Sequence, residues 1–314
     1  MLEKRSLRGN FSILSFPVEL GSDARGLGEA PQVLRNLGLK KILESGGGKV
    51  TDCGDVKVSN VEGCTVEGMK NFEPILKMLQ EGAQIVKERI DQGDRMVVLG
   101  GDHSISIGSI SGAVAGSDGE VGVIWIDSHA DLNTNKNSPT GNIHGMSSAV
   151  ILGEGHEKLV NLLGSGPKVK KENILYVGLK DLDHSEIDFI NVNNLSAVTI
   201  PDFINGGFSE ISEKIKALEK RVKYIWVSMD LDSIDKEFCP ASPMATKGGF
   251  TYREIVFIAK TIGRLSNVIG LDIVEWVPKK DKDNITANLA LELITAILGS
   301  EHSFYTEYIQ KHHK

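Results

Sequence analysis

Residues 121–131 read Val121-Gly122-Val123-Ile124-Trp125-Ile126-Asp127-Ser128-His129-Ala130-Asp131, an apolar run that ends in polar side chains. So short a run, rich in β-branched residues and followed by polar loop sequence, predicts a fully buried β-strand rather than a helix. Alternate side chains of an extended chain share one face, so Asp127, His129 and Asp131 can converge while the small residues between them point away. The stretch therefore predicts one half of a metal site.

Two other apolar runs end in the same kinds of side chain. Residues 95–99 lead into Gly100-Gly101-Asp102-His103, and residues 224–229 lead into Asp230-Leu231-Asp232. In an open parallel sheet, ligands bind outside the carboxyl ends of the strands, where loops from neighbouring strands meet. We therefore expect one crevice to collect six candidate metal ligands: His103, Asp127, His129, Asp131, Asp230 and Asp232.

Four carboxylates in so small a space repel one another and raise their own pKa values unless cations neutralise them. One divalent ion hardly suffices, whereas two ions could share Asp127 and Asp230 and hold a water between them. That water would be acidified into a nucleophile near neutral pH. Oxygen donors with two imidazoles favour two Mn²⁺ per chain, with Co²⁺ or Fe²⁺ as substitutes, over a structural zinc site. The alternative, that each Asp caps a helix or turn, does not explain three similar strand ends.

The whole chain has 314 residues, of which 40% are apolar, enough to bury a large core. No Pro- or Ser-rich linker interrupts the alternation of apolar strands with helical patterns, and no repeat of fixed period is present. We therefore expect a single domain over residues 1–314, with residues 301–314 as a C-terminal tail. The alternation predicts a three-layer α/β/α fold, in which helices cover both faces of a central, mainly parallel sheet.

The expected strands are followed along the chain by amphipathic or capped helical segments. Strands are expected at residues 11–16, 49–55, 95–99, 121–126, 174–179, 224–229 and 268–274. Helices are expected within residues 30–37, 72–92, 209–222, 252–265 and 284–298, and Ser104 is expected to cap the helix that follows it.

The formal net charge of -7 and the absence of a basic cluster argue against a nucleic-acid partner. An acidic balance suits a cationic substrate, although a soluble surface explains it equally well. The three cysteines (Cys53, Cys64 and Cys239) form neither an even set nor a Cys-x-x-Cys pair, so we expect a reducing, cytoplasmic location. No signal peptide or membrane-spanning run is expected.

Three segments carry a family resemblance. Gly100-Gly101-Asp102-His103-Ser104, Asp127-Ser128-His129-Ala130-Asp131 and Ser228-Met229-Asp230-Leu231-Asp232 resemble the signature segments of the ureohydrolases, the binuclear manganese enzymes that include arginase and agmatinase. The resemblance runs from about Pro17 to about Gly299, and its motifs are highly specific. It implies an eight-stranded, arginase-like sheet and a homotrimer or a hexamer built from trimers.

The loop after the central motif, residues 132–145, is rich in hydrogen-bond donors and acceptors. Its sequence resembles arginase more closely than agmatinase, and a solvated loop is the alternative interpretation. The resemblance implies that His144 is a proton shuttle. It also implies that four loop residues hold a substrate α-carboxylate, directly or through water: Asn133, Ser138, Thr140 and Asn142.

Three further acidic residues have counterparts in the family. The resemblance implies that Asp183 and Glu186 bind the α-amino group of a substrate, for which a carboxylate beside an ammonium is sound chemistry. A cap on the following helix is the alternative. Glu275 matches the glutamate that pairs with the substrate guanidinium, a planar cation that a carboxylate meets with two parallel hydrogen bonds.

The resemblance implies hydrolysis of L-arginine to L-ornithine and urea, with Asp131 orienting the nucleophile and receiving its proton. Alternatives are a ureohydrolase acting on agmatine, another guanidino acid or formiminoglutamate, and a non-catalytic metal-binding scaffold. Agmatine lacks the α-carboxylate that the 132–145 loop would recognise. Three departures from the family pattern affect the expected grip on the substrate: Met244 in place of a Thr, Trp276 in place of a smaller residue, and His184 in place of a Pro.

Overall fold

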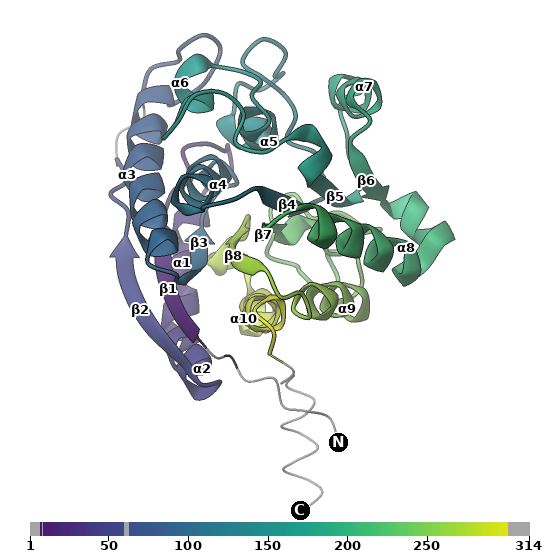
Figure 1. The fold of residues 1–314 in the computed structure, drawn as a ribbon. Coiled ribbons are helices and arrows are strands. Elements are labelled where there is room, and N and C mark those ends of the chain that lie inside the picture. Colours follow the sequence, from purple (N-terminus) through teal and green to yellow (C-terminus); the bar gives the residue numbers. More distant parts are fainter. Residues whose placement is uncertain (1–6, 8, 60–62, 301–314) are drawn as a thin grey trace, which may run out of the picture.

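The computed structural model describes residues 7, 9–59 and 63–300, so the expected tail at 301–314 lies outside the described residues. A single sheet runs through the middle of the molecule, with helices on both sides (Figure 1). The strands are β1 (Gly9–Phe16), β2 (Gly48–Asp55), β3 (Arg95–Gly100), β4 (Val121–Ile126), β5 (Ile174–Leu179), β6 (Ser196–Thr199), β7 (Tyr224–Asp230) and β8 (Val268–Val274). The α-helices are α1 (Ala30–Asn36), α2 (Leu39–Ser45), α3 (Phe72–Asp91), α4 (Ile105–Gly116), α5 (Ser147–Ile151), α6 (Glu157–Val160), α7 (His184–Asn193), α8 (Ile200–Arg221), α9 (Tyr252–Ile262) and α10 (Ile285–Ile297).

The sheet has eight strands in the order β2-β1-β3-β8-β7-β4-β5-β6, and every pairing within it is parallel. The three-layer α/β/α prediction is therefore confirmed. Parallel strands need crossover connections, and the helices between successive strands supply them. Because all strands run the same way, their carboxyl ends meet at one edge, where the candidate ligands were expected.

Side chains of the inner strands alternate between two apolar cores, one on each face of the sheet. In β4, Ile124 and Ile126 pack into the core formed with α1, α2, α8, α9 and α10. Val123 and Trp125 pack into the other core, formed with α3, α4, α5 and α6. Burial on both faces explains why the strands read as continuous apolar runs, since each fully buried large side chain contributes about 1.5–3 kcal/mol.

The long helix α3 illustrates how the sequence selects a helix. Its buried residues recur at intervals of three and four, which places them on one face: Phe72, Ile75, Leu76, Leu79, Ala83 and Val86. Helix α9 is fixed at its start by a capping box, in which Glu254 Oε2 accepts a hydrogen bond from the Thr251 N–H at 2.7 Å.

Several details differ from the expectation. Strand β6 and the short helices α2, α5 and α6 were missed, and α8 begins at Ile200, nine residues before the expected start at 209. Ser104 stands directly before α4, but its side chain makes no capping hydrogen bond and its Oγ is buried without a partner. Among the described residues, no helix is long and apolar enough to cross a membrane.

Candidate metal centre and substrate cavity

Four neighbouring strands in the middle of the sheet, β3, β8, β7 and β4, deliver the candidate residues. His103 follows β3, Glu275 follows β8, Asp230 ends β7, and Asp127 follows β4. Gly101 is required in the turn after β3, because an added Cβ would lie 1.7 Å from the Val18 carbonyl oxygen. Because Gly101 has no side chain, its backbone can pass close to Val18, and the chain that follows directs His103 toward Asp127 and Asp230.

The first group of side chains that could hold a metal ion contains His103, Asp127 and Asp230. The Nδ1 atom of His103 lies 3.1 Å from Oδ2 of Asp127 and 3.1 Å from Oδ2 of Asp230. Asp131 Oδ2 is also 3.1 Å from the same nitrogen. Four ligand atoms thus converge on one point.

The second group contains Asp127, His129 and Asp232. His129 Nδ1 lies 2.9 Å from Asp232 Oδ2 and 3.4 Å from Asp127 Oδ1. Asp127 belongs to both groups and turns a different carboxylate oxygen toward each. Asp230 belongs to the first group, and its Oδ1 accepts the Asp232 N–H at 2.7 Å. The six expected ligands are therefore brought together, with Asp127 placed as a bridge, and bridging by Asp230 stays a prediction.

The electrostatics of this cluster suit cations. Burial raises the pKa values of Asp131, Asp230 and Asp232, and the neighbouring carboxylates raise them further. His103 Nδ1 and Asp131 Oδ2 are buried without hydrogen-bond partners although they face one another. Imidazole nitrogen and carboxylate oxygen are ligands that a divalent metal accepts, so the cluster fits a binuclear metal site.

Two residues of the site have left-handed backbone conformations that non-glycine residues rarely adopt. Asp131 has φ of 50° and Glu275 has φ of 64°. Such strain clusters at functional sites, where the surrounding structure holds it in place. The carbonyl of Asp131 accepts hydrogen bonds from the Ala149 N–H at 3.1 Å and from Ser148 Oγ at 3.2 Å, which secure that turn.

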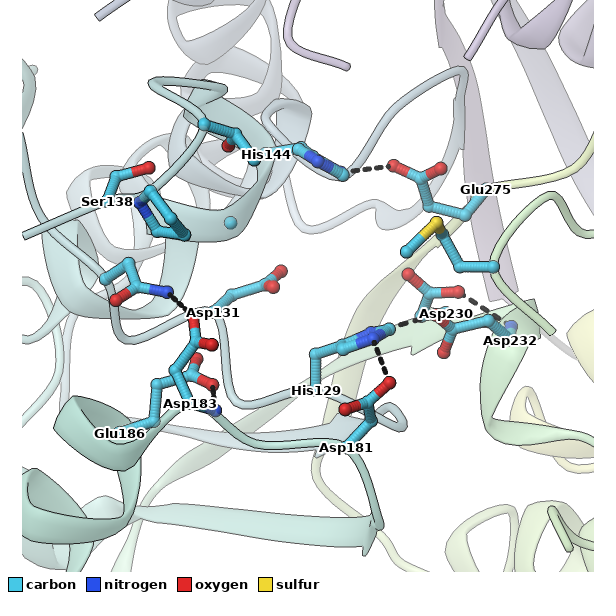
Figure 2. Close-up of a pocket in the computed structure, with 15 residues that line it drawn as sticks. His129, Asp131, Ser138, His144, Asp181, Asp183, Glu186, Asp230, Asp232 and Glu275 are labelled. Carbon is cyan, nitrogen blue, oxygen red and sulfur yellow. Dashed lines mark hydrogen bonds and ion pairs between the residues drawn. The ribbon is translucent and has the colours of Figure 1, made fainter. Parts of the chain in front are cut away.

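A cavity of about 270 Å³ opens above the cluster. Figure 2 shows His129, Asp131, Asp230 and Asp232 at one side of it and His144 facing Glu275 at another. The cavity is also lined by residues expected to bind the α-carboxylate and the α-amino group of an amino acid: Asn133, Ser138, Thr140, Asp183 and Glu186. His103 and Asp127 do not line it, because they are buried beneath it.

The loop predicted to hold a carboxylate is ordered by its own hydrogen bonds. Ser138 Oγ accepts the Gly141 N–H at 3.0 Å, and Asn133 Nδ2 donates to Asp183 Oδ2 at 2.7 Å. Asn142 does not line the cavity; its Nδ2 donates to Asp23 Oδ2 at 2.9 Å instead. The structure thus brings Asn133, Ser138 and Thr140 to the cavity and places Asn142 behind it.

Asp183 and Glu186 both line the cavity and form the capping box of α7. Glu186 Oε2 accepts the Asp183 N–H at 2.9 Å, and its Oε1 accepts the Leu132 N–H at 3.0 Å. Burial raises the pKa of Glu186 to about 7 in spite of these two bonds. The same pair of residues therefore both caps α7 and lines the cavity.

His144 Nδ1 and Glu275 Oε1 are 3.1 Å apart. Burial lowers the pKa of His144, but the Glu275 carboxylate more than offsets this and raises the pKa to about 9. Glu275 Oε1 also accepts the His103 N–H at 2.9 Å, whereas Oε2 is buried without a partner. One oxygen of Glu275 is therefore engaged and the other is left to accept a further donor.

The three departures from the family pattern have different surroundings. Met244 lines the cavity and is 47% exposed, so it can contact a bound molecule. Trp276 is fully buried in a core and does not line the cavity, so the expectation that it affects the grip on the substrate is not supported by its position. His184 is exposed at the first turn of α7. Asp181, which the sequence analysis did not assign, also lines the cavity; its place just after β5 was the available signal.

Comparison with known proteins gives a consistent result. The family model described as "Arginase family" matches residues 9–299. The arginase of Bacillus subtilis is 34% identical over 290 residues, which cover 92% of this chain and 98% of that protein. The structure of arginase from Bacillus caldovelox has a TM-score of 0.89 and 31% identity, covering 93% of this chain and 99% of the other. The Entamoeba histolytica arginase, solved in complex with L-ornithine, has a TM-score of 0.86 and 28% identity, covering 92% of this chain and 98% of the other.

Proposed function

Because the chain belongs to the arginase family and is a hydrolase, we propose that it converts L-arginine and water to L-ornithine and urea with two Mn²⁺ ions. The observation that carries the proposal is Asp127, whose two carboxylate oxygens face two different groups of ligands beneath the cavity. A bridging carboxylate is the feature that a two-metal hydrolytic site needs.

The first ion would be held by His103, Asp127, Asp131 and Asp230, and the second by Asp127, His129 and Asp232. Two such ions would lower the pKa of a water shared between them, so that hydroxide is available near neutral pH to attack the guanidinium carbon. Mn²⁺ is supported by the mixture of carboxylate and imidazole ligands, and Co²⁺ or Fe²⁺ would fit the same donors.

Glu275 would position the guanidinium group. Its Oε1 is held by the His103 N–H and by His144, and its buried Oε2 is without a partner. A guanidinium donates N–H bonds in a fixed plane, so a carboxylate oxygen fixed in this way would orient the carbon above the metal cluster. The strained backbone at Glu275 supports a positioning role, because it turns the side chain into the cavity.

Two residues would accept or donate protons during the reaction. Asp131 lines the cavity beside the other candidate metal ligands, where its carboxylate would be placed to receive the proton of the attacking water. His144 lines the cavity on the other side, paired with Glu275, and would pass a proton between solvent and the leaving amine.

The far end of the cavity would hold the amino-acid part of the substrate. Asn133, Ser138 and Thr140 offer amide and hydroxyl groups to an α-carboxylate, and Asn142 would act by holding Asp23 beside the loop. Asp183 and Glu186 offer carboxylates to an α-ammonium. The partners of the α-carboxylate favour arginine over agmatine, because agmatine lacks that carboxylate and would leave Asn133, Ser138 and Thr140 unpaired.

The test is product formation by protein that has been loaded with Mn²⁺. With L-arginine as the only substrate, urea and ornithine are expected to form in equal amounts. Protein that binds two Mn²⁺ ions but releases no urea would contradict the proposal and favour a non-catalytic metal-binding scaffold.

We also propose a cytoplasmic location and assembly into a homotrimer or hexamer. All three cysteines are free, as a reducing compartment requires. Exposed apolar side chains on α8 and α9, Ile204, Phe208 and Phe257, support a contact between subunits. Light scattering would give the mass of the assembly, and a monomeric mass at micromolar concentration would contradict it.

A further inference from the structure

Asp272, in the middle of β8, is fully buried beneath the metal cluster and accepts four hydrogen bonds. Its Oδ1 accepts from Ser106 Oγ at 2.9 Å and Ser228 Oγ at 2.6 Å. Its Oδ2 accepts from Ser109 Oγ at 2.6 Å and Trp226 Nε1 at 2.7 Å. Burying a carboxylate costs free energy unless hydrogen-bond donors replace the lost water. The four donors around Asp272 supply that compensation and hold the carboxylate in a fixed position.

One of these donors connects Asp272 to a metal ligand. Ser228 Oγ lies 2.9 Å from His103 Nε2. Ser228 Oγ is also 3.1 Å from Ser106 Oγ, but its shortest contact is to Asp272 Oδ1 at 2.6 Å, to which Ser106 Oγ donates as well. The single hydroxyl hydrogen of Ser228 therefore points to Asp272, and a lone pair of Ser228 faces the imidazole. His103 must then carry its hydrogen on Nε2, which leaves the Nδ1 lone pair directed at Asp127, Asp131 and Asp230.

The ring of His103 is also held in its plane. It stacks on Trp125 with the ring centroids 4.4 Å apart and the planes 14° apart. Stacking sets the plane but leaves the choice of tautomer open, so the hydrogen bond to Ser228 decides which nitrogen can bind a metal.

The second histidine has no comparable support. His129 Nε2 lies 3.8 Å from Asp181 Oδ2, and the Asp181 side chain is 70% exposed. That distance exceeds a hydrogen bond, and water competes for the carboxylate. The buried relay thus serves only one of the two groups of ligands.

We propose that Ser228 and Asp272 are positioning residues that fix the tautomer of His103 and thereby set the metal affinity of the first ion position selectively. The inference rests on the two-ion site of the proposed function. Groups that orient a ligating histidine typically change metal affinity by about 10- to 100-fold when they are removed.

The test compares Ser228→Ala with Ser109→Ala in the full-length protein. Both substitutions remove one buried hydroxyl donor from Asp272, but only Ser228 contacts His103. Mn²⁺ binding is measured by calorimetry, and the spin-coupled signal of the ion pair is followed by electron paramagnetic resonance. In Ser228→Ala we expect one binding step to weaken about 10- to 100-fold, the other to stay unchanged, and the coupled signal to require higher Mn²⁺. Ser109→Ala should bind as the wild type does, and Ser228→Thr should restore binding.

Equal weakening of binding in both variants, or unchanged binding in Ser228→Ala, would overturn the relay while the proposed function stands. Wild-type protein that binds no Mn²⁺ would overturn both. If Ser228→Ala does not fold, the wild type loaded with diamagnetic Zn²⁺ answers the question by nuclear magnetic resonance. A slowly exchanging Nε2–H proton of His103 is expected there, and a His103 ring without that proton would overturn the inference.

Discussion

The imidazole of His144 and the carboxylate of Glu275 contact one another in the cavity wall, with Nδ1 of the histidine 3.1 Å from Oε1 of the glutamate. The same Oε1 accepts the His103 N–H at 2.9 Å, so it joins a candidate proton shuttle to the main chain of a candidate metal ligand. The roles of His144 and His103 can be tested separately, because His103 belongs to a group of candidate metal ligands and His144 does not.

Replacing His144 by Asn is expected to lower turnover of arginine by about 100-fold or more, as loss of a general acid–base group does. Metal content should stay normal, since His144 lies in neither group of ligands. Elemental analysis and steady-state kinetics measure the two effects, and imidazole buffer should restore part of the activity. Loss of metal in the variant would contradict the assignment.

The pairing of His144 with Glu275 should make the stability of metal-free protein depend on pH. The pKa of His144 is raised from 6.5 to about 9, so the folded state binds its proton more tightly than the unfolded chain does. The resulting stabilisation is fully present below about pH 6.5 and is lost as the pH rises through about 9. The difference in unfolding free energy between wild type and His144→Asn should therefore shrink across this window in urea titrations. A difference that grows with pH would contradict the pairing.

Asp127→Ala should lose both metal ions, because Asp127 alone belongs to both groups of ligands. His103→Asn should mainly lose one ion. Asp181→Ala is the matched control, since Asp181 lines the cavity but belongs to neither group. Metal analysis of the three variants after gel filtration measures the outcome, and full double occupancy in Asp127→Ala would exclude the bridging arrangement.

Asp183→Asn separates the helix cap from substrate binding. Asn caps a helix about as well as Asp, so the variant should lose no more than about 1 kcal/mol of stability. If Asp183 binds the α-ammonium, loss of its charge removes a hydrogen bond to a charged group, and KM for arginine should rise roughly tenfold or more. Thermal melts and kinetics on one preparation give both values. An unchanged KM would restrict Asp183 to a capping role.

The strands and metal ligands could be predicted from the sequence because a buried parallel strand permits few alternatives. Residues 121–126 are apolar on both faces, and the ligands follow at the carboxyl end. β6 was missed because Ser196–Thr199 is only four residues long and only Val198 is buried. The early start of α8 was not predicted because glycines interrupt the helical pattern. Gly207 has a non-helical φ of 61° inside the helix.

The network around Asp272 could not be predicted. A serine in a strand or helix gives no sign of whether its hydroxyl meets water or a buried carboxylate, and Ser106, Ser109 and Ser228 come from segments that only the fold brings together. For the same reason the sequence could not show which carboxylate oxygen of Asp127 faces each group of candidate ligands, or that Asn142 turns toward Asp23. Side-chain direction at the end of a strand depends on the neighbouring loops.

The most direct test of the central claim is the specificity constant, kcat/KM, of the Mn²⁺-loaded protein for L-arginine, agmatine and formiminoglutamate, measured side by side. The cavity offers polar groups to an α-carboxylate, carboxylates to an α-ammonium and Glu275 to a guanidinium, and arginine alone has all three groups. Arginine should therefore be preferred by a large factor, because each missing group leaves buried polar atoms unpaired. Faster turnover of agmatine or formiminoglutamate than of arginine would contradict the account.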